Sequence, residues 1–169
     1  PKGFRYHVVS CTGQTMSDGT LVPGDHDGMA AYRGPRGTTI LVRNHELSNR
    51  ENKFGNLLGC AVPDALKYDT WANGGTPTLV LDNQGRLVKD YVSIGGTNNN
   101  CAGGLTPWGT WLTCEETTQL ATGNFQQRHG YVFEVPALAD GPVAAQPIVA
   151  MGRFSHEATA TDPRTGIVY

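Results

Sequence analysis

The sequence has 169 residues, with 13 Lys and Arg against 15 Asp and Glu and a formal net charge of −2. This balance gives no electrostatic reason to expect a nucleic acid or an anionic membrane surface as a partner. No apolar run reaches the roughly 18 residues that cross a bilayer, so no membrane span is expected. Charged residues make up only 17%, while 22 glycines and 10 prolines favour tight turns and short strands. The composition therefore predicts an all-β protein.

Short apolar segments separated by turn residues predict a series of antiparallel hairpins. In chain order, the paired segments are 28–33 with 38–42, 78–82 with 86–94, 102–105 with 110–114, and 158–162 with 167–169, and a further strand is expected at 130–136. The stretch 62–71 is the one helical candidate, and an irregular loop explains it equally well. Because strands do not alternate with helices, a parallel α/β sheet is disfavoured.

A weak internal repeat favours one all-β architecture over the others. Three segments begin with an acidic or thiol residue, continue with small residues, and are followed by a turn and an apolar strand: 27–30, 101–104 and 157–160. Their starts lie about 74 and about 56 residues apart, a spacing consistent with propeller blades that carry loop insertions. The repeat predicts a single partial β-propeller domain over 1–169, with about two to three blades and blade hairpins near 27–46, 78–94, 101–116 and 157–169.

The last residues bear on the size of the whole domain. The sequence stops inside the apolar strand at 167–169, and an open propeller would leave strand edges and half a core without partners. We therefore expect other residues of the same, longer polypeptide to form the remaining blades.

Acidic and thiol residues stand at the hairpin ends, where the start of a first strand lies beside the end of a second. They are Asp27, Glu46, Cys101, Glu116 and Glu157. If the first strands line a central channel, these ends converge on one mouth, where crowded carboxylates would repel one another unless cations lay between them. The carboxylates suit calcium and the thiolate of Cys101 suits a transition metal, so the pattern predicts a metal site.

Two features qualify this ligand set. Successive strand residues point to opposite faces, so only one of Glu115 and Glu116 is expected to face the channel, and Glu116 follows Thr110 by the same interval as Glu46 follows Ile40. The four cysteines are Cys11, Cys60, Cys101 and Cys114. Their wide spacing leaves disulfides and buried thiols both open. We expect Cys101 to be a free thiolate, because metal ligation requires the deprotonated sulfur and excludes a disulfide, and we expect any disulfide to involve the other cysteines.

The run NCAGGLTPWGTWLTCEE at 100–116 resembles the signature of PhoX-type alkaline phosphatases. Supporting matches are DGMA at 27–30, RNHE at 43–46 and GRFSHEA at 152–158, in the expected order. The resemblance covers the N-terminal portion of the family's domain. It implies a β-propeller hydrolase of small phosphomonoesters that uses a calcium and iron cluster and is secreted or periplasmic after twin-arginine export.

The resemblance also implies residue roles. Cys101 would bind iron, Glu46, Glu116 and Glu157 would bind iron or calcium, and Glu115 is a weaker candidate ligand. Metal chemistry of this kind needs no side-chain nucleophile, and the sequence contains neither a G-x-S-x-G elbow nor a P-loop. Because further ligands would come from later blades, residues 1–169 alone are expected to be inactive.

Two alternatives remain open from the sequence. A calcium-dependent lactonase or esterase on a similar propeller would use the carboxylates without iron, and Cys101 distinguishes it from the phosphatase. A non-catalytic secreted propeller would use calcium only to hold its blades together. In that case Trp71, Trp108 and Trp111 would supply a partner surface, although tryptophans beside a turn more often pack into a core.

Overall fold

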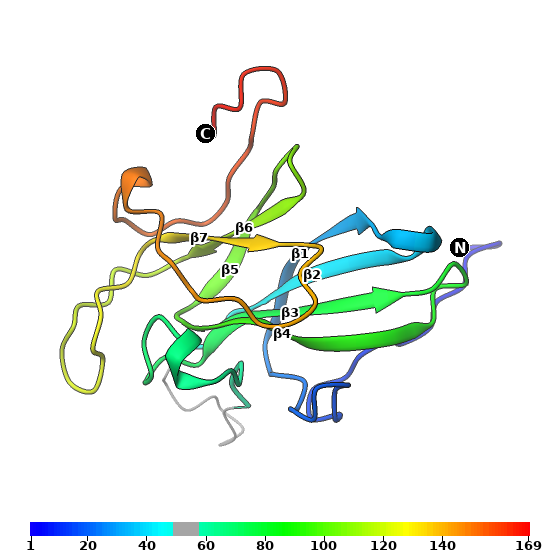
Figure 1. Ribbon diagram of the computed structural model, residues 1–169, viewed down its shortest axis with the longest axis horizontal. Coiled ribbons are helices and arrows are strands. Elements are labelled where there is room, and N and C mark those ends of the chain that lie inside the picture. The colour runs from blue at the N-terminus through cyan, green and yellow to red at the C-terminus, as the bar shows by residue number, and fades with distance from the viewer. Residues whose placement is uncertain (49–57) are drawn as a thin grey trace.

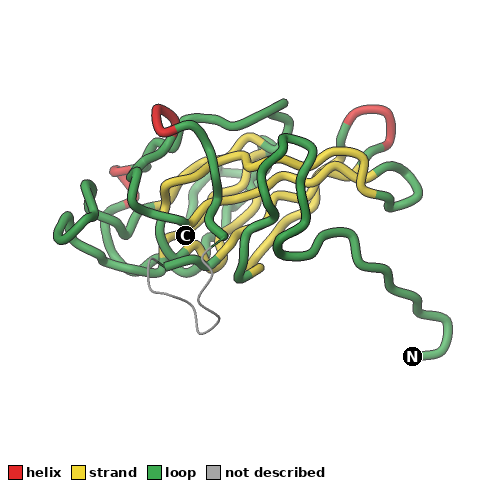
Figure 2. Tube along the Cα trace, turned by 90° about the horizontal axis from the view of Figure 1, so that it is seen from below, coloured by secondary structure: helices red, strands yellow, loops and turns green. Residues whose placement is uncertain are grey.

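The computed structural model describes residues 1–48 and 58–169, and this part of the chain folds into two antiparallel sheets (Figure 1). It contains three short 3-10 turns and no α-helix, which confirms the predicted all-β class. The strands gather in the centre of the molecule with loops around them, while the first residues extend away from the body (Figure 2). Among the described residues, no helix is long and apolar enough to cross a bilayer.

The first sheet has four strands in the order β1-β2-β3-β4. They are β1 (His26–Arg33), β2 (Thr39–His45), β3 (Gly74–Leu81) and β4 (Leu87–Thr97), and the 3-10 turn η1 (Pro35–Gly37) joins β1 to β2. The hairpins expected near 27–46 and 78–94 are both present. They form one sheet, because β2 pairs with β3 from Thr39 with Leu81 to His45 with Gly75.

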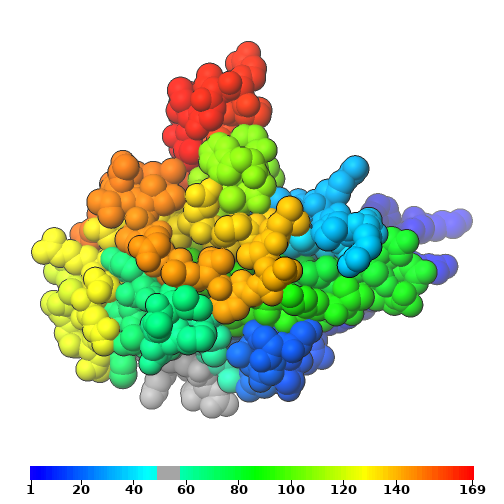
Figure 3. Space-filling model, viewed as in Figure 1, coloured from blue at the N-terminus to red at the C-terminus, as the bar shows by residue number. Residues whose placement is uncertain are grey.

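The second sheet has three strands in the order β5-β6-β7. They are β5 (Asn100–Leu105), β6 (Thr110–Glu115) and β7 (Val132–Pro136), as the turn pattern predicts. The hairpin expected at the end of the sequence is reduced to an isolated bridge between Thr161 and Val168, on a segment that projects from the body in Figure 3. The 3-10 turn η3 (Val149–Met151) precedes it.

The stretch at 62–71 is a loop with a single 3-10 turn, η2 (Asp64–Leu66). Within the stretch, only the 3-10 bonds from the amides of Leu66 and Lys67 to the carbonyls of Pro63 and Asp64 are local. Other backbone groups bond to distant segments: the carbonyl of Leu66 accepts from the amide of Ala145, and the amide of Asp69 donates to the carbonyl of Gly96. Lys67 is extended, with φ −70° and ψ 146°. These tertiary bonds explain why the helical alternative is not realised.

The three repeated segments lie side by side. A β-carbon added at Gly28 of β1 would lie 2.9 Å from the Cα atom of Ala102 in β5, and one added at Gly104 would collide with the carbonyl oxygen of Thr159. The amide of Thr159 donates to the carbonyl of Gly103 at 3.3 Å. The small residues of the repeat are therefore explained by close backbone approach. Residues 1–48 and 58–169 form no closed ring, so the propeller itself stays a prediction.

Apolar and polar contacts together join the two sheets. The main core cluster takes residues from both, namely Ala30, Ile40, Val42, Ile94, Trp111, Phe133, Val135, Ala137 and Ala145. Beside it, the fully buried amide of Asn44 donates to the carbonyl of Ala102 at 2.7 Å and accepts from the Trp111 indole at 2.8 Å and the Thr113 hydroxyl at 2.9 Å. This network fixes the ends of β2, β5 and β6 relative to one another.

Candidate metal centre

The ends of the first and third predicted hairpins meet through Asn99. Its side-chain amide donates to Glu46 Oε1 at 3.2 Å and to the carbonyl of Glu116 at 3.3 Å, and its own carbonyl accepts from the amide of Glu116 at 3.0 Å. Asn99 has φ 57°, in the left-handed region that asparagine tolerates better than most residues. No local pattern in the sequence signals this bridging role.

Three carboxylates share the resulting surface. Burial, a hydrogen bond with Asp27 and the charges of Asp27 and Glu116 raise the pKa of Glu46, and the bond from Asn99 acts against them. A contact between two carboxyl groups requires a proton or a cation between their oxygens. Among residues 1–48 and 58–169, no Lys, Arg or His forms an ion pair with Asp27, Glu46 or Glu116. The cluster therefore carries negative charge that the described residues leave uncompensated.

Cys101 lies at the edge of this carboxylate cluster. Its side chain is only 6% exposed, and Sγ lies 3.5 Å from the carbonyl oxygen of Glu157. Burial, reinforced by the charges of Glu116, Glu46 and Asp27, raises the pKa of Cys101 to about 11. All four cysteines are free, in agreement with the prediction for Cys101. Without a cation nearby, Cys101 is a protonated thiol, and a bound cation would favour the thiolate.

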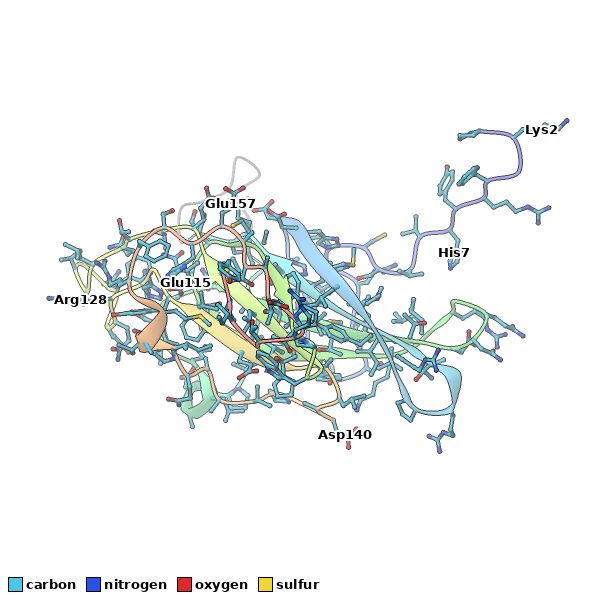
Figure 4. All side chains as sticks on the ribbon, turned by 90° about the horizontal axis from the view of Figure 1, so that it is seen from above. Lys2, His7, Glu115, Arg128, Asp140 and Glu157 are labelled. Carbon is cyan, nitrogen blue, oxygen red and sulfur yellow. The ribbon has the colours of Figure 1, made fainter. Side chains whose placement is uncertain are left out.

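Glu157 joins the group through its backbone. Its carbonyl accepts from Cys101, while its side chain is exposed on the surface (Figure 4). In the part of the chain that the structure describes, no hydrogen bond or ion pair joins the Glu157 carboxylate to Glu46 or Glu116. The structure thus brings Asp27, Glu46, Glu116 and Cys101 together and sets Glu157 beside them.

Glu115 has a different environment from its neighbour Glu116. Glu116 is exposed, whereas Glu115 is fully buried, as strand alternation predicts for adjacent residues. Glu115 Oε1 accepts from the amide of Asn98 at 2.9 Å and from His129 Nδ1 at 2.7 Å, and Oε2 accepts from the amides of Gly130 at 2.7 Å and Tyr131 at 3.1 Å. Both oxygens are therefore occupied within the fold.

Two further members of this buried network, His129 and Asp69, were not identified from the sequence. His129 Nε2 lies 3.4 Å from Asp69 Oδ2, and that oxygen also accepts from the amides of Gln126 and Gln127 at 2.7 and 2.8 Å. The Asp69 side chain also accepts from the amide of Trp71 at 2.8 Å. The loop that carries Asp69 and the loop that carries His129 are held together in this way, and no local spacing in the sequence signals their pairing.

The donor types fit a mixed site for hard and soft cations, but the set is incomplete. Carboxylate oxygens suit calcium, and a thiolate suits iron. In residues 1–48 and 58–169, no three His, Cys, Asp or Glu side chains are arranged as a metal-binding group. The uncompensated carboxylates are the observation that favours a cation, and further donors would be needed to enclose it.

A pocket of about 350 Å³ opens beside the carboxylates. Glu116 and Asn99 belong to both the pocket wall and the hairpin-end cluster. The remaining lining residues are Ser48, Trp71, Asn98, Thr117, Gln119 and Phe125.

Comparison with known proteins identifies the family of the chain. The family model described as alkaline phosphatase PhoX matches residues 1–90 and 83–169, which together cover the whole chain. No curated protein and no solved structure gives a significant match. Since the family model spans the sequence that brings the acidic hairpin ends and Cys101 together, the chain belongs to the PhoX alkaline phosphatase family.

Proposed function

We propose that this chain forms part of a metal-dependent phosphomonoester hydrolase whose cations are held at the hairpin ends. The observation that carries the proposal is the convergence of Asp27, Glu46 and Glu116 without a compensating cation among residues 1–48 and 58–169. Calcium and iron are the proposed metals, with Cys101 as the iron ligand and Glu157 as a further carboxylate. Secretion or a periplasmic location, after twin-arginine export, belongs to the same proposal.

Two residues of this chain, Asn99 and Cys101, would prepare the site for metal binding. Asn99 orients Glu46 through its amide and ties it to the strand end that carries Glu116. Cys101 would hold a cation as its thiolate, so loading of the site would release the proton of this thiol. When bound, the metals would neutralise the charge that builds on the transferred phosphoryl group.

The remaining propeller blades, from the same polypeptide, are proposed to supply the missing donors and close the site. Support comes from the incomplete ligand set among the described residues. Residues 1–169 alone are therefore expected to bind metal weakly and to lack phosphatase activity.

Metal analysis combined with phosphatase assays of the full-length protein tests the proposal. We expect calcium and iron to co-purify with activity on phosphomonoesters, and exhaustive chelation to abolish that activity until both metals are restored. Hydrolysis that survives complete metal removal would contradict the proposal. Calcium without iron, together with lactone or ester hydrolysis in place of phosphatase activity, would favour the alternative calcium-dependent enzyme.

A further inference from the structure

The pocket beside Glu116 has a location that matters for substrate binding. Its wall shares Glu116 and Asn99 with the carboxylate cluster, so a phosphate held at the cluster would direct the rest of its ester toward the pocket. Its volume of about 350 Å³ is at the lower end of the range typical of small-molecule pockets. The space therefore suits one small organic group.

One wall of the pocket is aromatic and held in place. The Phe125 ring packs edge-on against His129, with ring centroids 5.3 Å apart. The following residues, Gln126 and Gln127, donate their amides to the buried carboxylate of Asp69. Because His129 is itself fixed by Glu115, the position of Phe125 is set by the fold before any ligand arrives.

The lining of the pocket also offers polar groups. Asn98 is only 4% exposed, its Oδ1 atom is buried, and within the described part of the chain that oxygen accepts no hydrogen bond. A buried amide oxygen without a partner is uncommon and marks a place for a donor from outside the protein. Thr117 and Gln119 add further polar side chains to the pocket lining.

We propose that this pocket binds the leaving group of the phosphomonoester and favours a planar aromatic one. The inference rests on the proposed function, since the phosphate must be held at the carboxylate cluster. The aromatic group would pack against Phe125, while a hydroxyl or amino donor on it, or a water molecule, would reach Asn98.

The test compares phenyl phosphate with ethyl phosphate as substrates of the full-length, metal-loaded protein. Each variant is described by its ratio of kcat/KM values for the two esters, relative to the wild-type ratio, which removes the intrinsic difference in reactivity. Phe125→Ala should lower this ratio by about five- to tenfold, the size of effect expected from one lost aromatic contact. Phe125→Tyr, which keeps the ring, should retain it. Trp108→Ala is the control for loss of an aromatic ring elsewhere, because Trp108 is half exposed, lies on the β5–β6 turn and does not line the pocket.

A binding measurement separates recognition from chemistry. Calorimetry should show phenylphosphonate binding more tightly than methylphosphonate to the wild-type protein, with the difference lost in Phe125→Ala. Unchanged ratios in Phe125→Ala, or equal losses in Trp108→Ala, would overturn the pocket assignment while leaving phosphatase activity intact. A wild-type protein that hydrolyses neither ester would instead contradict the proposed function.

Discussion

Glu115 and Glu116 are adjacent carboxylates, and changing each to glutamine should have opposite consequences. Glu115 is buried with four hydrogen-bond donors around its two oxygens, whereas Glu116 is exposed beside the other carboxylates. Glutamine preserves the shape of both side chains. We expect Glu115→Gln to destabilise the fold and Glu116→Gln to weaken metal binding with little effect on folding.

The magnitude follows from the contacts. In Glu115→Gln one oxygen becomes an amino group that faces two donors, either Asn98 and His129 or Gly130 and Tyr131. Two charge-assisted hydrogen bonds are lost and two buried donors are left unpaired, at about 1.5 to 3 kcal/mol each, so we expect a loss of about 3 to 6 kcal/mol. Removing the exposed charge of Glu116 should change the free energy of unfolding by less than about 0.5 kcal/mol.

Urea unfolding of the full-length protein in the presence of a chelator measures these changes without a contribution from bound metal. A loss of several kcal/mol should move the midpoint of Glu115→Gln to lower urea by about 1 M or more, with the slope unchanged. Metal content and phosphatase activity are then measured on the folded variants. If Glu115→Gln unfolds within about 0.5 kcal/mol of wild type, the buried network does not have the role assigned to it.

Three further predictions concern other parts of the described structure. Burial and the neighbouring Arg43 lower the pKa of His45 from 6.5 to about 3. The folded-state pKa of His45 therefore lies below the unfolded-state value. The contribution of neutral His45 to stability is fully present above pH 6.5 and is lost as the pH falls toward 3. At about pH 5 the wild type should have lost about 2 kcal/mol through this residue, and His45→Gln should flatten the acid side of the stability curve measured by urea unfolding. Glu157→Gln should lower metal retention and turnover far more than Glu134→Gln, which changes an exposed β7 residue bonded to Trp108 and Thr110; equal effects in metal analysis would argue against a ligand role for Glu157. Asn44→Ala removes three buried inter-sheet bonds and should cost about 3 kcal/mol in thermal or urea unfolding, and a loss below about 1 kcal/mol would show that the apolar core alone joins the sheets.

Local sequence signals were sufficient for strands β1 to β7 and for the approach of the first and third hairpin ends. Turn residues between apolar segments predicted β1 to β7, and the small residues at 27–30, 101–104 and 157–160 identified three segments that do pack against one another. Both signals are local, because a tight turn and a close backbone approach each demand particular residue types at the position itself.

The parts that could not be predicted depend on contacts between distant segments. The pairing of β2 with β3 across a long connection joins two expected hairpins into one sheet, and no residue in either hairpin specifies that partner. The assignment of Glu115 to a buried network required His129 and Asp69, which come from two separate loops. Strand alternation separated Glu115 from Glu116, but it could not say what the buried member of the pair would bind.

The close approach of Gly28 to Ala102 makes the spacing between the hairpin ends a property of the backbone. A β-carbon at Gly28 would have to displace β5, whose next residue toward the carboxylate cluster is Cys101. Metal ligands tolerate distance errors of only about 0.2 Å, which is less than a new methyl group would require here. Gly28 thus works as a spacer whose lack of a side chain sets the separation of the Cys101 thiol from the neighbouring carboxylates.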